Sequence, residues 1–221
     1  MNNLSVAAER ASDPVILLVR IPLKADAFAG FLSVMRNNVQ ESRKEPGNIS
    51  FHAYQPEDGG PDLILVEHWK SQAVLDIHGD TPHLNAVKAA FQQAARDGQG
   101  MDIAKLTAIS PAAAQKDIPS PETTRNVVVV LHVKSDARDS VEKALLDVVG
   151  PSRAAPGNIS FDVYENQENK NNFVLVERWV SIAAHEAHLS QPYNRPLQEL
   201  LSTSLTQPLD SDRSLLKDVS R

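Results

Sequence analysis

The sequence contains no cysteine, and this absence excludes several kinds of site at once. A chain without thiols has no disulfide framework, no thiolate nucleophile and no zinc–thiolate centre. Because structural disulfides are rare in the cytoplasm, their absence here favours a cytoplasmic location. Aromatic residues are also scarce, at 5% of the 221 residues, and include two tryptophans.

Features that bind large or charged partners are absent as well. The net charge is −6 and no cluster of lysine and arginine occurs, which argues against nucleic acid because clustered cations bind phosphate backbones. No glycine-rich loop predicts a nucleotide or flavin site. The aliphatic run Val127 to Leu131 is too short to cross a membrane. Met1 to Asp13 has no apolar core and contains Glu9, which predicts a short disordered lead-in and not a signal peptide.

What the sequence does contain is an internal duplication. The hexapeptide Pro46 to Phe51 returns unchanged 110 residues later as Pro156 to Phe161, and the pattern Leu-Val-Glu-x-Trp of Leu65 to Trp69 returns at Leu175 to Trp179. A period of this length is the size of a small domain. The predicted organisation is repeat 1 at 14–110, a linker at 111–125, repeat 2 at 126–209 and a tail at 210–221.

Hydrophobic periodicity predicts the same elements in both repeats. Short aliphatic runs and alternating side chains indicate strands, and apolar residues at helical spacing indicate amphipathic helices. Asp26 and Asp136 stand where helix N-caps are expected, and Ser71 and Ser181 stand before the next helices. The predicted strands are Val15–Ile21, Asn48–Tyr54, Leu63–Trp69 and Met101–Ile109 in repeat 1, with Asn126–Val133 as the first strand and Leu205–Leu209 as the closing strand of repeat 2.

Each repeat therefore has the predicted order β-α-β-β-α-α-β, an α+β arrangement with helices on one face of an antiparallel sheet. Both faces of the hairpin strands carry bulky apolar groups, so the bare sheet face of one repeat is expected to be covered by that of the other. This predicts an intrachain pseudo-dimer that resembles an isologous homodimer. A further homodimer of whole chains is compatible with the sequence.

These motifs resemble those of a known family. The order Pro-Gly-Asn-Ile-Ser-Phe, hairpin, Leu-Val-Glu-x-Trp, then Ser71, His78 and Pro82, is similar to that of the antibiotic biosynthesis monooxygenase domain, over residues 14–110 and 125–209. The resemblance implies two ferredoxin-like repeats forming an intrachain dimeric α+β barrel. It also implies oxidation of quinols or aromatic anthrones without a cofactor. Related domains degrade haem, isomerise small metabolites or have no known reaction, because a fold does not fix a function.

Two positions in each repeat are candidates for binding a substrate. Trp69 and Trp179 can form a wall on which a planar molecule stacks, or serve only as core residues. Glu67 and Glu177 share the tryptophan face of their strands and can orient a ligand or a histidine, or accept structural hydrogen bonds from amides at a helix start. The predicted substrate-binding residues are Trp69, Trp179, Glu67, Glu177, Tyr193, Phe51 and Phe161.

His78 and His188 are the predicted catalytic bases. A neutral imidazole with a pKa of about 6.5 can remove a phenolic proton and leave an electron-rich anion that reacts with dioxygen. His83 and Tyr193 each open the following helix and can reach a shared pocket, so His83 is a predicted helper. Alternatively, His78 and His188 are helix-end residues that interact with the last carbonyl groups.

No metal or cofactor is expected from the sequence. His185 and His188 are three residues apart on a predicted helix, but no third ligand accompanies them, and repeat 1 has Leu75 in place of His185. The prediction is therefore a cofactor-independent monooxygenase that uses dioxygen as co-substrate and a small quinol-like or phenolic molecule as substrate. Two alternatives stay open: a non-catalytic ligand-binding or stress-response module of the same fold, and a haem-degrading monooxygenase. The resemblance to haem degraders is incomplete, because Val15–Ile21 offers no asparagine for the expected pocket.

Overall fold

The computed structural model describes residues 13–111, 116, 118 and 120–221. The predicted disordered lead-in, except Asp13, and part of the predicted linker lie outside these residues. The chain divides into two compact units. The first comprises the chain up to Lys105 together with Asp218–Arg221, and the second comprises Leu106–Lys217.

The first unit is built on three antiparallel strands: β1 (Val15–Ile21), β3 (Leu63–Trp69) and β2 (Asn48–Pro56), with β3 in the middle. β1 is buried along its length except at Arg20, as its aliphatic run predicts. The end of the chain adds to β2, where the Val219 N–H donates to the Ala53 carbonyl oxygen at 2.9 Å.

The second unit repeats this pattern with β5 (Arg125–His132), β7 (Asn172–Trp179) and β6 (Asn158–Asn166), and β7 is central. Two further strands complete its sheet. β8 (Arg213–Asp218) pairs with β5, and the last residues of β4 (Asp102–Ala108) pair with β6.

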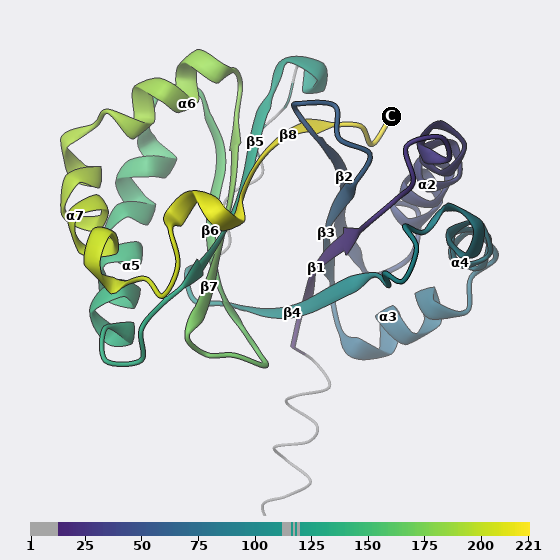
Figure 1. Ribbon diagram of the computed structural model, residues 1–221, viewed down its shortest axis with the longest axis horizontal. Helices are drawn as coiled ribbons and strands as arrows, with labels where there is room; N and C mark the ends of the chain where they lie inside the picture. The colour runs from purple at the N-terminus through teal and green to yellow at the C-terminus, as the bar shows by residue number, and fades with distance from the viewer. Residues whose placement is uncertain (1–12, 112–115, 117, 119) are drawn as a thin grey trace, which may run out of the picture. The chain divides into compact units, whose positions relative to one another are not determined.

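In each unit the helices lie together on one side of that unit's strands (Figure 1). The faces that the helices cover form two apolar cores, one containing Trp69 and Phe51 and the other Trp179 and Phe161. Among the described residues, no helix combines the length and apolar character needed to cross a membrane. The helices are α2 (Phe28–Ser42), α3 (Gln72–Gly79), α4 (Pro82–Ala94), α5 (Arg138–Ala154), α6 (Ile182–Leu189) and α7 (Arg195–Ser204), with short 3-10 turns at Pro121–Thr123, Pro192–Asn194 and Leu209–Asp212.

The α+β fold class predicted from the sequence is confirmed. Antiparallel pairing joins the strands in the order β1-β3-β2 within the first unit and β8-β5-β7-β6-β4 within the second. The hairpins β2–β3 and β6–β7 are present as predicted, and Ser71 and Ser181 cap α3 and α6.

The predicted closing strand of repeat 2 is wrong. Leu205–Leu209 contains Pro208, which has no N–H to donate to a ladder, and only Leu205 makes a single bridge, to Val133. The strand is instead β8, in the segment predicted to be a tail. The 110-residue offset would have found it, because this offset carries β4 to residues 212–218.

The predicted helix caps at Asp26 and Asp136 are also wrong. The N-cap positions are Ala27 and Ala137, and neither helix has a side-chain cap. The Ala27 N–H donates to the Lys24 carbonyl oxygen at 3.2 Å, so the chain already turns before the helix starts. Asp26 therefore lies one residue before the position from which a side chain reaches the first free amides.

Gly47, in the turn before β2, has a backbone conformation that disfavours other residues. Its φ is +98°, and a Cβ there would lie 2.7 Å from Val74 Cγ1 of α3. Its counterpart Gly157 has φ +79° and would place a Cβ 2.7 Å from Ala184 Cβ. The turn has the same geometry in both repeats. It holds the N-terminal part of α3 close to the start of β2, and that of α6 close to the start of β6.

We expect G47A to lower the free energy of unfolding by roughly 1 to 3 kcal/mol, because the new methyl group meets both an unfavourable φ and the Val74 side chain. Urea-induced unfolding measures this loss. G30A is the matched control: Gly30 lies in α2 with nothing within 4 Å of the added Cβ, so the same substitution should raise stability by roughly 0.5 to 1 kcal/mol. Equal effects of the two substitutions would contradict the role assigned to the turn.

Candidate active site

The predicted site residues of repeat 1 gather at the end of β3. Trp69 is the last residue of this strand and its side chain is fully buried. Glu67 precedes it by two residues and so shares its face of the sheet. The indole Nε1–H donates to Glu67 Oε2 at 3.0 Å. The carboxyl group therefore accepts a hydrogen bond from the indole, and not from helix amides as one prediction suggested.

His78 is brought to this pair by α3. Ser71 caps the helix by accepting from the Val74 N–H at 3.5 Å, and His78, the last residue but one of the helix, has a buried side chain. The imidazole lies over the Trp69 indole with ring centroids 4.5 Å apart and an interplanar angle of 32°. Phe51 of β2 presents its edge to both rings, at 6.4 Å and 6.2 Å.

One further residue of this cluster, Glu45, was not predicted from the sequence. Glu45, between α2 and β2, places its Oε1 atom 2.7 Å from His78 Nδ1 and 2.9 Å from His83 Nε2. No periodicity or repeat identified Glu45, because repeat 2 has Ala155 at the same position. Its adjacency to the repeated Pro46-Gly47 turn was the available signal.

Repeat 2 builds a related cluster with different neighbours. Trp179 Nε1–H donates to Glu177 Oε2 at 3.0 Å, and the His188 ring stacks on the indole at 4.5 Å and 25°. His188 Nδ1 lies 2.8 Å from the Tyr193 hydroxyl, which stands where repeat 1 has His83. Two histidine nitrogens lie near Glu177 Oε2: His185 Nε2 at 3.9 Å and His188 Nε2 at 3.8 Å.

Burial dominates the protonation of the two carboxyl groups. Removal from water raises the pKa of Glu67 to about 7, against the hydrogen bond from Trp69 that lowers it, and the charge of Glu45 raises it further. Burial likewise raises the pKa of Glu177 to about 7, and the Trp179 hydrogen bond acts in the opposite direction. Burial therefore favours the protonated, uncharged form of both groups.

The imidazoles shift in the other direction for the same reason. Burial lowers the pKa of His185 and of His188 to about 4. Burial also lowers the pKa of His78, although its hydrogen bond to Glu45 raises it. Each inner imidazole is therefore neutral at working pH and carries a lone pair that can accept a proton.

Every predicted catalytic and substrate-binding residue belongs to one of these two clusters. Their depths differ: the inner imidazoles of His78 and His188 are each only 3% exposed, whereas the His83 side chain is 13% exposed and Tyr193 is half-buried. His132, by contrast, lies away on β5 and binds Asp212 at 3.0 Å. The arrangement can pass a proton from a half-buried outer group to a buried inner imidazole.

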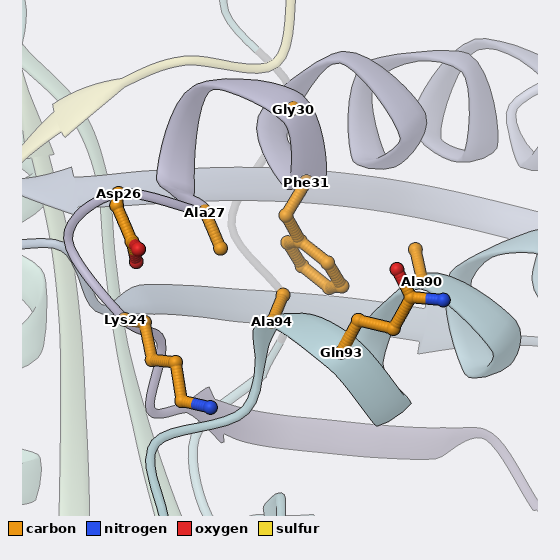
Figure 2. Close-up of a pocket in the computed structure, with 8 residues that line it drawn as sticks. All are labelled: Lys24, Asp26, Ala27, Gly30, Phe31, Ala90, Gln93 and Ala94. Carbon is orange, nitrogen blue, oxygen red and sulfur yellow. The ribbon is translucent and has the colours of Figure 1, made fainter.

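A pocket of about 450 Å³ in the first unit lies outside these clusters. Figure 2 shows its Phe31 ring between α2 and the end of α4. None of the predicted site residues lines it. Its wall is formed by Lys24, Asp26, Ala27, Gly30, Phe31, Ala90, Gln93 and Ala94.

Comparisons with known proteins agree with the duplication and the fold. A profile of the family described as antibiotic biosynthesis monooxygenase matches the chain twice, at residues 14–90 and 124–199. The chain aligns with the solved structure of a provisionally named monooxygenase from Fusobacterium nucleatum, with a TM-score of 0.84 at 18% sequence identity. The alignment covers 94% of this chain and 93% of the other, and it supports the fold alone.

Relatives identified by sequence carry different names. An uncharacterised protein of Synechocystis is 30% identical over 83 residues, which are 38% of this chain and 56% of the relative. An isomerase of Yersinia enterocolitica, named for (4S)-4-hydroxy-5-phosphonooxypentane-2,3-dione, is 35% identical over 68 residues, or 31% of this chain and 71% of the relative. The match to the Synechocystis protein thus spans little more than half of that protein's length.

The pKa of Glu177 predicts a specific dependence of stability on pH. Since folding raises this pKa from 4.5 to about 7, Glu177 contributes stability that is present below pH 4.5 and is lost as the pH rises through 7. E177Q removes this loss and keeps an acceptor for the indole. Between pH 4.5 and pH 8, we expect the unfolding free energy of E177Q to rise relative to the wild type by on the order of 3 kcal/mol.

Urea-induced unfolding of both proteins at the two pH values measures this difference. The control is E186Q, because Glu186 lies exposed on the neighbouring helix α6. Its stability difference from the wild type should be the same at both pH values. Parallel profiles for E177Q and the wild type would show that the carboxyl group is ionised in the folded protein well below pH 7.

Proposed function

The chain belongs to the antibiotic biosynthesis monooxygenase family, and on this premise we propose that it is a cytoplasmic, cofactor-independent monooxygenase of a quinol-like or phenolic small molecule. The observation that carries the proposal is the buried imidazole of His188, stacked on Trp179 at 4.5 Å and joined through Nδ1 to the Tyr193 hydroxyl at 2.8 Å. An imidazole must be unprotonated before it can accept a phenolic proton, and burial favours this form by lowering the pKa of His188.

The proton route runs from outside inward. A substrate hydroxyl approaches the half-buried outer group, which is Tyr193 in repeat 2 and His83 in repeat 1. In repeat 2, Tyr193 accepts the proton of the substrate as it gives its own to His188 Nδ1 across their hydrogen bond. In repeat 1, His83 takes the corresponding proton with help from His78. The indoles hold the imidazoles in place, and the edges of the phenylalanine rings, Phe51 and Phe161, keep water away from them.

The chemistry balances without an external electron donor. The phenolate anion gives one electron to dioxygen, and the resulting radical and superoxide combine at a ring carbon to form a peroxide. Loss of water from this peroxide converts the C–H carbon into a carbonyl. One phenol and one dioxygen thus give one quinone and one water, and each product receives one of the two atoms of dioxygen.

A second candidate function is isomerisation by proton transfer, which the sequence likeness to the Yersinia enterocolitica isomerase favours. The same neutral imidazoles would move a proton next to a carbonyl group of the substrate, and dioxygen would have no part in the reaction. Oxygen dependence therefore separates the two candidates.

We expect H78Q/H188Q to lower the initial rate of oxygen uptake with a quinol by roughly 100- to 10,000-fold, because both inner bases are lost. An oxygen electrode measures the rate, and circular dichroism checks the fold. H132Q is the matched control, since His132 binds Asp212 away from both clusters, and it should keep the wild-type rate. A wild-type rate in H78Q/H188Q would remove these histidines from the reaction.

Turnover of a panel of quinols with and without air tests the class of reaction. We expect quinone formation, followed by absorbance, to stop under nitrogen and to resume on readmission of air. Product formation that continues under nitrogen would favour an isomerase, and no turnover in either condition would favour a non-catalytic binding module. A Soret band on titration with haem, followed by its loss in air with a reductant, would instead identify haem degradation.

A further inference from the structure

Three side chains of repeat 1 converge on one point, and one of them, Glu45, has no role in the proposed reaction. Glu45 Oε1 lies 2.7 Å from His78 Nδ1 and 2.9 Å from His83 Nε2, and the three atoms lie within 4.8 Å of one another. Two imidazole nitrogens and a carboxylate oxygen are a ligand set used for Zn²⁺ and for Fe²⁺ in proteins. The geometry points to a binding site for a divalent first-row metal ion, formed by Glu45, His78 and His83.

Two of the three spacings between these atoms are close to those around such an ion. Around a tetrahedral ion with bonds of about 2.0 to 2.1 Å, donor atoms lie about 3.3 Å apart. The contacts between Glu45 and the two histidines would open by only about half an ångström on binding, and the two imidazole nitrogens, which lie within 4.8 Å of each other, would approach by at most about 1.5 Å. With three protein ligands the fourth position stays available for water or substrate.

The backbone holds these ligands in position before any ion arrives. His78 lies at the end of α3 and His83 at the start of α4. Thr81 joins the two helices: its Oγ1 donates to the His78 carbonyl oxygen at 2.8 Å and accepts from the Leu84 N–H at 3.4 Å. Thr81 therefore fixes the backbone connection between the two helices, and the two imidazole ring centroids lie 5.6 Å apart.

The ligands are sheltered but reachable. The His78 side chain is 3% exposed, whereas those of Glu45 and His83 are 15% and 13% exposed. An ion can therefore approach from the side of Glu45 and His83. A metal ion binds the deprotonated form of all three side chains, so the affinity of the site for the ion should fall in acid.

Repeat 2 provides an internal comparison. It keeps the inner imidazole as His188 but has Ala155 and Tyr193 at the positions of the other two ligands. His188 Nδ1 faces the neutral Tyr193 hydroxyl at 2.8 Å instead of a carboxylate. The site is therefore expected once per chain, and the base of repeat 2 stays free when the metal occupies His78 and His83. This inference does not depend on the proposed oxygenation.

Isothermal titration calorimetry of the full chain, freed of metal by a chelator and without a polyhistidine tag, tests the site directly. With Zn²⁺ at pH 7.5 we expect one ion per chain, and with Mg²⁺, which prefers oxygen ligands, no binding. Substitution by Co²⁺ should give visible ligand-field bands. E45Q keeps the acceptor for both imidazoles but removes the charge, and we expect it to weaken Zn²⁺ binding by roughly 100-fold or more.

Two further variants separate this site from other histidines. A155E/Y193H copies the ligands into repeat 2, and we expect it to bind two Zn²⁺ ions per chain. H185Q removes the histidine nearest His188 and should leave the single Zn²⁺ site intact, because His185 belongs to repeat 2. Undetectable Zn²⁺ binding to the wild type, an unchanged affinity in E45Q, or loss of binding in H185Q would each overturn the proposal.

Discussion

Burial of a carboxyl group beside an indole is the constraint on which both clusters depend. In each repeat the glutamate two residues before the tryptophan accepts the indole N–H at 3.0 Å, and its pKa rises to about 7 because it has left water. The same burial lowers the pKa of the neighbouring imidazole. Burial therefore favours the uncharged form of both the acid and the base. Each repeat thus keeps a neutral base inside a core without placing a full charge there.

Gene duplication preserved this inner arrangement and let its surroundings diverge. Trp, Glu and inner His recur at an offset of 110 residues, and the rings of each Trp–His pair lie 4.5 Å apart in both repeats. The outer group is His83 in one repeat and Tyr193 in the other. Glu45 has no acidic counterpart, since Ala155 stands at its position. The two clusters therefore share a buried imidazole but differ in its hydrogen-bond partner, which is the Glu45 carboxyl group in repeat 1 and the Tyr193 hydroxyl in repeat 2.

Much of the fold was predictable because the sequence states it twice. β1 and β3 begin and end where the aliphatic run and the Leu-Val-Glu-x-Trp pattern predicted. β8 was missed because its two leucines stand among charged residues, although the duplication register pointed to it. Glu45 was missed for another reason: it meets His78 across 33 positions of sequence, and only the folded chain brings a turn and two helices to one point. Local periodicity predicts elements, but it does not predict which side chains converge.

The difference between the outer groups decides what each repeat can do with a proton. Burial raises the pKa of Tyr193, so this phenol exchanges a proton with His188 without staying ionised. His83 instead shares the Glu45 carboxylate with His78. Burial lowers the pKa of His78, but the hydrogen bond and the charge of Glu45 oppose this effect, whereas burial alone lowers the pKa of His188 to about 4. The inner imidazole of the first repeat is therefore supported by a carboxylate, and that of the second repeat has a phenol as its proton partner.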